Sequence, residues 1–140
     1  MFTRLAVLGS LVAALCVLAA PALGKGTPHA DSSITLNQGG TSLAQTAPRL
    51  GSTVSFTAAY PTSIKNPRVE VLCYQNGDLV YGEAGAPTDT FLLGGNPDRG
   101  SIWRTTLGPA SCVANLYYFT WKAGEPAATY LATTSFEAAG

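Results

Sequence analysis

Proline recurs along the chain after residue 25, and no stretch of helical period survives between these prolines. A proline inside a helix removes a backbone hydrogen bond and clashes with the preceding turn, and here prolines stand at positions 48, 61, 67, 87, 97, 109 and 126. The segments between them carry short alternating or β-branched runs bounded by Gly, Pro and Asn, a pattern typical of strands and turns. The sequence therefore predicts an all-β domain, a two-sheet sandwich of about seven to eight antiparallel strands. The predicted strands are Ser33–Asn37, Thr53–Ala59, Arg68–Gln75, Asp78–Glu83, Thr90–Leu93, Ile102–Leu107, Cys112–Lys122 and Tyr130–Glu137.

The best local signal is the pair Asn76-Gly77, which lies between two strand patterns. Both central residues of a two-residue type I′ turn need positive φ, and Asn-Gly meets that need. One face of this hairpin then holds Val and Cys side chains and is the better core candidate, while Leu and Tyr side chains share the other face. The predicted register pairs Gln75 with Asp78, Tyr74 with Leu79, Cys73 with Val80, and Leu72 with Tyr81.

The first 24 residues have the three parts of a secretory signal peptide. Arg4 precedes an apolar run over residues 5–17, and small residues follow that run. The run is too short to predict a durable transmembrane helix, and cleavage is expected after Ala22 or after Gly24. The mature protein is then secreted, and works outside the cell or in the cell envelope. The expected divisions are a signal peptide over 1–24, a flexible segment over 25–31 and a β-sandwich domain over 32–140.

Two cysteines, Cys73 and Cys112, remain after the signal peptide. Exported proteins fold in an oxidising compartment, so an even number of cysteines predicts one disulfide bond. Removing Arg4 leaves seven of the eight Lys and Arg against eight Asp and Glu, so the mature chain has a net charge near minus one. Such a balance offers no basic stripe to nucleic acid. A zinc site needs about four ligands, and with His29 as the single histidine, no metal or other cofactor is expected.

Catalytic chemistry has few candidate residues in this chain. A serine nucleophile needs a base, and His29 lies in the expected flexible segment. Paired carboxylates can hydrolyse glycosidic bonds, but Glu70 and Glu83 are predicted to oppose each other beside Arg68 as a solvated charge cluster. We therefore expect a protein that is not an enzyme.

The order of the strands resembles that of a secreted bacterial immunoglobulin-like domain. Residues 51–57 are similar to the second, B-type strand of such domains, the Asn-Gly hairpin to strands C and C′, and the last two predicted strands to F and G. The resemblance spans most of residues 32–138. It implies that C and F are neighbours in one sheet and that Cys73 and Cys112 form a bridge between them.

The same arrangement predicts one aromatic sheet face. If Cys112 points to the core, then Ala114, Leu116 and Tyr118 also point inward, and the alternate residues of that strand point outward. The opposite sheet is expected to present hydroxyl groups instead. Exposed aromatic patches usually mark interaction sites. The candidate binding residues are Leu72, Tyr74, Tyr81, Asn115, Tyr117, Phe119 and Trp121.

Two alternatives explain this pattern without an exposed patch. The segment 84–100 or the chain termini can fold over the face and make it a second core, or a β-bulge can reverse part of the strand over 112–122.

The function expected from an exposed face is binding or adhesion, either to a protein partner or to a second copy of the chain. Aromatic rings also stack on sugars, so a carbohydrate-binding domain is one alternative. A structural component of a cell-surface or envelope assembly is the other.

Overall fold

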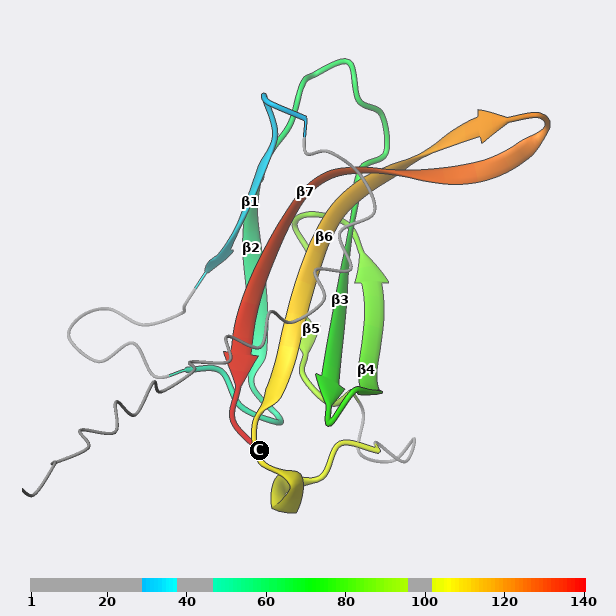
Figure 1. Cartoon of the computed structure of the whole chain (residues 1–140). Coiled ribbons are helices and arrows are strands. Elements are labelled where there is room, and N and C mark those ends of the chain that lie inside the picture. Colours follow the sequence, from blue (N-terminus) through cyan, green and yellow to red (C-terminus); the bar gives the residue numbers. More distant parts are fainter. Residues whose placement is uncertain (1–28, 38–46, 96–101) are drawn as a thin grey trace, which may run out of the picture.

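The computed structural model describes residues 29–37, 47–95 and 102–140, and within them the chain is all-β (Figure 1). The strands are β1 (Ser33–Asn37), β2 (Thr53–Ala59), β3 (Arg68–Gln75), β4 (Asp78–Gly85), β5 (Phe91–Leu92), β6 (Ala110–Lys122) and β7 (Glu125–Ala138), with one short 3-10 helix, η2 (Thr105–Leu107). They form two antiparallel sheets, one in the order β1-β2-β5 and one in the order β4-β3-β6-β7. The predicted all-β, two-sheet fold is confirmed. The expected signal peptide lies outside the described residues.

The first three predicted strands are confirmed with the same bounds, because the residues that alternate inward are apolar in all three, apart from Gln75 at the end of β3. The strand predicted over residues 102–107 is wrong. That segment is a loop that ends in η2, and it inserts Trp103, 3% exposed, into the core. The side-chain amide of Gln75 forms hydrogen bonds with the N–H and the C=O of Arg104. A side chain therefore takes the place that a neighbouring strand would have as the hydrogen-bond partner of this residue.

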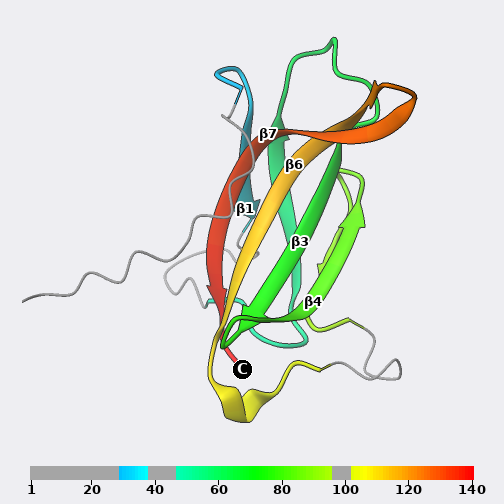
Figure 2. The same cartoon turned by 45° about the vertical axis from the view of Figure 1, so that its right-hand side comes forward.

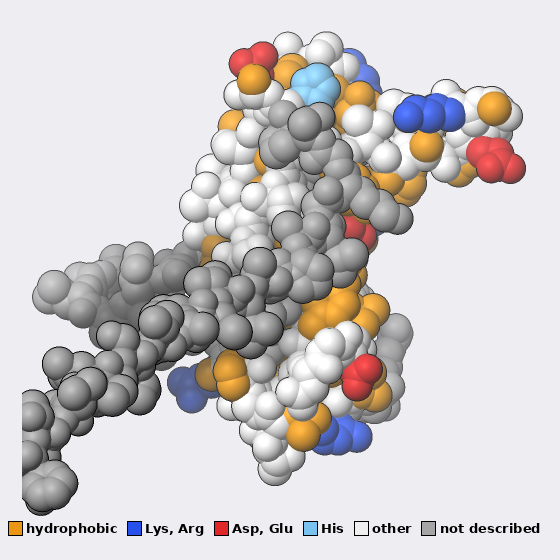
Figure 3. All heavy atoms as spheres, in the orientation of Figure 1, with side chains coloured by type: hydrophobic (Ala, Val, Ile, Leu, Met, Phe, Trp, Pro, Cys, Tyr) orange, Lys and Arg blue, Asp and Glu red, His pale blue; other side chains and the backbone are white. Residues whose placement is uncertain are grey.

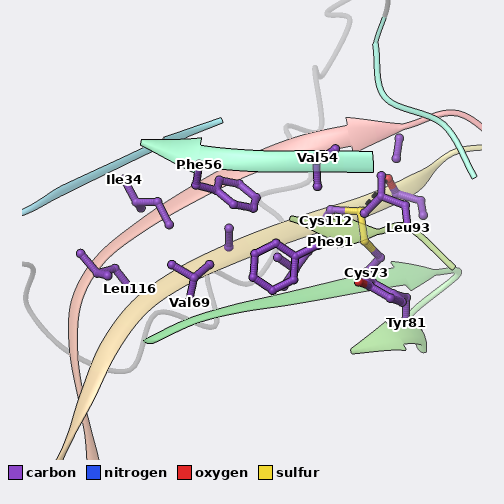
Figure 4. Close-up of a cluster of buried hydrophobic side chains, with 14 of the residues drawn as sticks. Ile34, Val54, Phe56, Val69, Cys73, Tyr81, Phe91, Leu93, Cys112 and Leu116 are labelled. Atoms are coloured by element: carbon purple, nitrogen blue, oxygen red, sulfur yellow. Dashed lines mark hydrogen bonds between the residues drawn. A yellow bond between two sulfur atoms is a disulfide. The ribbon is translucent and has the colours of Figure 1, made fainter. Parts of the chain in front are cut away.

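The core fills the space between the two sheets. Figure 4 shows Ile34, Val54 and Phe56 of one sheet pointing toward Val69 and Leu116 of the other. The ring of Phe56 meets that of Phe91, on β5, edge to face, with the ring centroids 5.8 Å apart. Val54 and Phe56 are buried there, with side chains 4% and 5% exposed.

The predicted disulfide joins Cys73 on β3 to Cys112 on β6 (Figure 4). The two residues are direct partners in the ladder, with their Cα atoms 4.0 Å apart, and both side chains are buried in the core. Because side chains alternate along a strand, this pair fixes the direction of every regular neighbour in β3 and β6.

The hairpin of β3 and β4 begins as predicted and then departs from the predicted register. Asn76 and Gly77 have φ of 52° and 91°, and the pairs Gln75 with Asp78 and Tyr74 with Leu79 are confirmed. A β-bulge follows, so Cys73 pairs with Tyr81 instead of Val80, and Leu72 pairs with Gly82 instead of Tyr81. The extra residue lets both apolar side chains, Val80 and Tyr81, turn inward, where they are 8% and 7% exposed.

The hairpin of β6 and β7 is longer than predicted, because β7 begins at Glu125 rather than at Tyr130. Ala123 and Gly124, with φ of 51° and 86°, form its two-residue turn. Its outer part, residues 118–129, is named the arm here. Since β3 begins at Arg68, opposite Tyr117, the arm residues of β6 pair only with β7 among the described strands. Figure 1 shows the arm projecting away from the two sheets, and Figure 2 shows the same projection from another side.

Candidate functional site

The outer face of the four-stranded sheet carries most of the candidate binding residues. With Cys73 and Cys112 inward, Leu72, Tyr74 and Asn115 face outward by strand alternation. The same alternation directs Tyr117, Phe119 and Trp121 outward along β6. Figure 3 shows hydrophobic side chains along the projecting arm. These six residues lie on one side of the sheet, but their side chains differ greatly in exposure.

A hydrogen-bonded polar group divides this face into two parts. The carboxylate of Glu70 accepts bonds from Asn115 Nδ2 at 3.1 Å and from the hydroxyl of Tyr130 at 3.2 Å, and Thr133 Oγ1 donates to Asn115 Oδ1 at 2.8 Å. Partial burial and the nearby charge of Glu70 raise the pKa of Tyr130. Asn115 is thus occupied by structural contacts on both sides of its amide group. The prediction that Glu70 and Glu83 oppose each other is wrong, since Glu70 pairs with Ala84.

Tyr117 is buried beneath neighbouring aromatic rings and is not an exposed contact residue. Its side chain is 7% exposed, although it lies on the outer face and outside the central core cluster. The ring of Phe119 stands edge-on against it at a centroid distance of 5.4 Å, and the ring of Tyr130 lies at 5.8 Å. The expectation that this ring is accessible is therefore wrong, because aromatic neighbours on the same face cover it. The predicted site did not include Tyr130, because the last predicted strand began only at that residue.

Tyr81 does not lie on the candidate surface. The bulge in β4 places it opposite Cys73 on the inner face, and it is 7% exposed. Its hydroxyl donates a hydrogen bond to the carboxylate of Glu83. Burial, this hydrogen bond and the charge of Glu83 all raise its pKa above the ordinary value of a tyrosine. The predicted outward position of Tyr81 is wrong by one residue of register.

The exposed part of the face lies on the arm, where Phe119 is 54% and Trp121 is 76% exposed. Both side chains line one wall of an open groove of about 790 Å³. The other walls come from the loop between β2 and β3 and from the loop between β4 and β5. The predicted site included neither loop. Their lining residues are Tyr60, Lys65, Asn66, Pro67, Arg68, Ala86, Pro87 and Thr88.

The groove has a positive character. Lys65 and Arg68 line it, and no carboxylate is among its described lining residues. Lys65 Nζ donates to the carbonyl of Thr62 at 3.3 Å, and Arg68 Nη2 donates to the carbonyl of Ala84 at 3.1 Å. Both cations therefore bond neutral carbonyls, and within the described part of the chain neither has a carboxylate partner. Aromatic rings and unpaired cations thus converge on one open surface.

Other kinds of site find no support in the residues that the structure describes. Over residues 29–37, 47–95 and 102–140, no three His, Cys, Asp or Glu side chains gather where they could hold a metal ion. That part of the chain also contains no helix with the length and apolar character needed to cross a membrane. The chain matches no protein-family model, no curated protein and no solved structure.

Proposed function

We propose that this chain is an exported, non-catalytic binding module that engages a protein partner, or a second copy of itself, through Phe119 and Trp121 of the arm. The observation that carries the proposal is the exposure of these two large apolar side chains, 54% and 76%, on one face of a ribbon that projects from the domain. The binding surface is smaller than the sequence indicated, since Tyr81 and Tyr117 are buried.

The energetics of the arm support this proposal. A two-stranded ribbon without a third strand is at best marginally stable in water, and Phe119 and Trp121 place little of their surface in the core. Trp is among the residues most enriched in the few positions that dominate binding energy. Trp121 lies two residues from Phe119 on the same face of β6, and the ring of Phe119 packs edge-on against that of Tyr117.

The strand order supports an immunoglobulin-like classification within the same proposal. Sheets in the orders β1-β2-β5 and β4-β3-β6-β7 correspond to A-B-E and C′-C-F-G of such domains. Loops and sheet faces of that fold are common places for recognition. The disulfide between the C-like and F-like strands stiffens the sheet that carries the arm.

A carbohydrate ligand is the second candidate, and one observation favours it. Tyr60, Phe119 and Trp121 line the same groove, so their rings are available to a sugar that enters it. Titration of the wild type and of Trp121→Ala with soluble oligosaccharides, followed by tryptophan fluorescence, separates this candidate from a protein partner.

We expect Trp121→Ala to weaken partner binding or self-association by about thirtyfold, the effect of losing about 2 kcal/mol at a binding hot spot. Stability is expected to change by no more than about 0.5 kcal/mol, because the side chain is largely exposed. Capture from envelope extracts, sedimentation and the affinity for the captured protein measure the binding effect. Urea unfolding measures the stability effect.

Ile102→Ala is the matched control for this experiment, since Ile102 is 57% exposed and lies in the loop before η2 rather than on the arm. It should leave both binding and stability unchanged. A sharp fall in the melting temperature of Trp121→Ala, with capture and oligomeric state intact, would show that the arm is packed in solution and that this surface binds nothing.

Export is also part of the proposal, supported by the three-part N-terminus and by the disulfide, which persists in oxidising compartments. Amino-terminal sequencing of material from the culture medium or envelope should then begin at Leu23 or Lys25. Recovery of intact Met1 in a cytoplasmic pool would contradict export.

A further inference from the structure

The arm leaves one edge of β6 open. Pro67 comes directly before β3 and has no backbone N–H to offer to a ladder, and Asn66 has a positive φ of 51° that turns the chain. Pairing between β3 and β6 therefore ends at Arg68 and Tyr117. Beyond that point, no described strand lies on this side of β6.

The backbone groups on this open edge follow from the turn. In a two-residue hairpin, the residues that flank the turn form a hydrogen-bonded pair, here Lys122 and Glu125. Alternation then directs the N–H and C=O of Phe119 and Trp121 away from β7, toward the open edge. These are the same two residues whose side chains line the groove. An added strand would find backbone partners and aromatic contacts at the same place.

The charges of the groove favour an acidic occupant. Lys65 and Arg68 line the groove, and they have no carboxylate partner among the described residues. A second arm is a poor match for them, because Glu125 is the single acidic residue over positions 118–129 and it lies opposite Lys122. An acidic chain from another protein is a better match.

We infer that the groove receives an extended acidic segment of a partner protein, which adds to β6 as a strand beside Phe119 and Trp121. This inference rests on the proposed protein-binding function and specifies its partner. The segment occupies the row of the sheet that β3 leaves at Arg68. Its backbone pairs with Phe119 and Trp121, and its Asp or Glu side chains reach Lys65 and Arg68. Strand addition of this kind obtains affinity from main-chain bonds and specificity from alternate side chains.

The test is selection of a linear random-peptide library on the folded, disulfide-bonded domain. We expect the enriched peptides to carry Asp or Glu at alternate positions and to lack Lys and Arg. Their affinity should fall about tenfold in the double variant Lys65→Ala/Arg68→Ala, which loses two exposed ion pairs with the peptide, and should fall as salt is raised. Arg49→Ala is the matched control, because Arg49 is exposed and does not line the groove.

Two further measurements separate strand addition from simple charge attraction. Bound peptide should slow hydrogen exchange at the amides of Phe119 and Trp121. Methylation of single peptide nitrogens should abolish binding at every second position, since alternate amides of an added strand face β6.

Several outcomes would overturn the inference. They are the absence of enriched peptides, equal binding to the double variant, and unchanged exchange at Phe119 and Trp121. Binding of polygalacturonate without binding of any peptide would replace it with an anionic-glycan site. If the library yields nothing while Trp121→Ala still abolishes partner capture, the arm binds a folded surface: the proposed function stands and strand addition falls.

Discussion

The double variant Cys73→Ala/Cys112→Ala is expected to lose about 4 kcal/mol of unfolding free energy relative to the oxidised wild type. The disulfide spans a sequence separation of 39 residues, and closing a loop of that length in the unfolded chain has an entropic effect of about this size. For a domain whose total stability is about 5–15 kcal/mol, this is a large share. The melting temperature should fall by roughly 15 °C.

Urea unfolding of the wild type and the double variant measures this difference directly. The wild type treated with a reductant should approach the stability of the double variant, and the double variant should not respond to the reductant. Equal stabilities of the oxidised wild type and the double variant would contradict the expected contribution. Ready alkylation of both wild-type thiols in the native state would contradict the bond itself.

The position of the disulfide explains why much of the fold is predictable from the sequence. Two cysteines in a chain that is expected to be exported predict a bond, and the bond between Cys73 and Cys112 sets the inward face of both central strands. Alternation along β2 also predicts its bounds, and the Asn-Gly turn predicts the first two pairs of the hairpin of β3 and β4. These signals are local or covalent, so they can be read without knowing the remaining contacts.

The errors arise where a tertiary contact overrides a local pattern. The bulge that turns Tyr81 inward adds one residue to β4, and the predicted continuous alternation contains no sign of it. The early start of β7 was missed because Pro126 suggests a break. Pro126 pairs with Trp121 on an edge strand, where its missing N–H would point away from β6.

The candidate site was predictable only in part for the same reason. Phe119 and Trp121 follow from the alternation of β6, and both are exposed as expected. The groove depends on loops around Lys65 and Pro87, which only the folded sheets bring to the arm. In the sequence Tyr117 resembles Phe119 and Trp121. Only the contacts of its ring in the folded structure show that it is covered by other aromatic rings and not exposed.

Gln75→Ala is expected to lower the free energy of unfolding by about 3 kcal/mol, because it removes three hydrogen bonds of a buried side chain at about 1 kcal/mol each. Gln75 is 2% exposed and is the residue that fastens the loop before β6. Its Nε2 donates to the carbonyls of Arg104 at 2.9 Å and Gly108 at 2.7 Å, and its Oε1 accepts from the N–H of Arg104 at 2.9 Å. Removal of the amide breaks these three bonds, while the carbonyl of Arg104 keeps the bond from the N–H of Leu107, at 3.2 Å.

Asn37→Ala is the matched control, because the amide of Asn37 also makes two hydrogen bonds, with Ser55 and Thr57, but on an exposed surface. Water replaces those partners, so this variant should lose no more than about 1 kcal/mol. Urea unfolding compares the two variants, and hydrogen exchange reports where the change lies. In Gln75→Ala, the amide of Arg104 should exchange faster while the central amides of β6 stay protected. A stability within about 0.5 kcal/mol of the wild type, or an unchanged Arg104 amide, would mean that other contacts hold this loop and that the buried Gln75 is not its anchor.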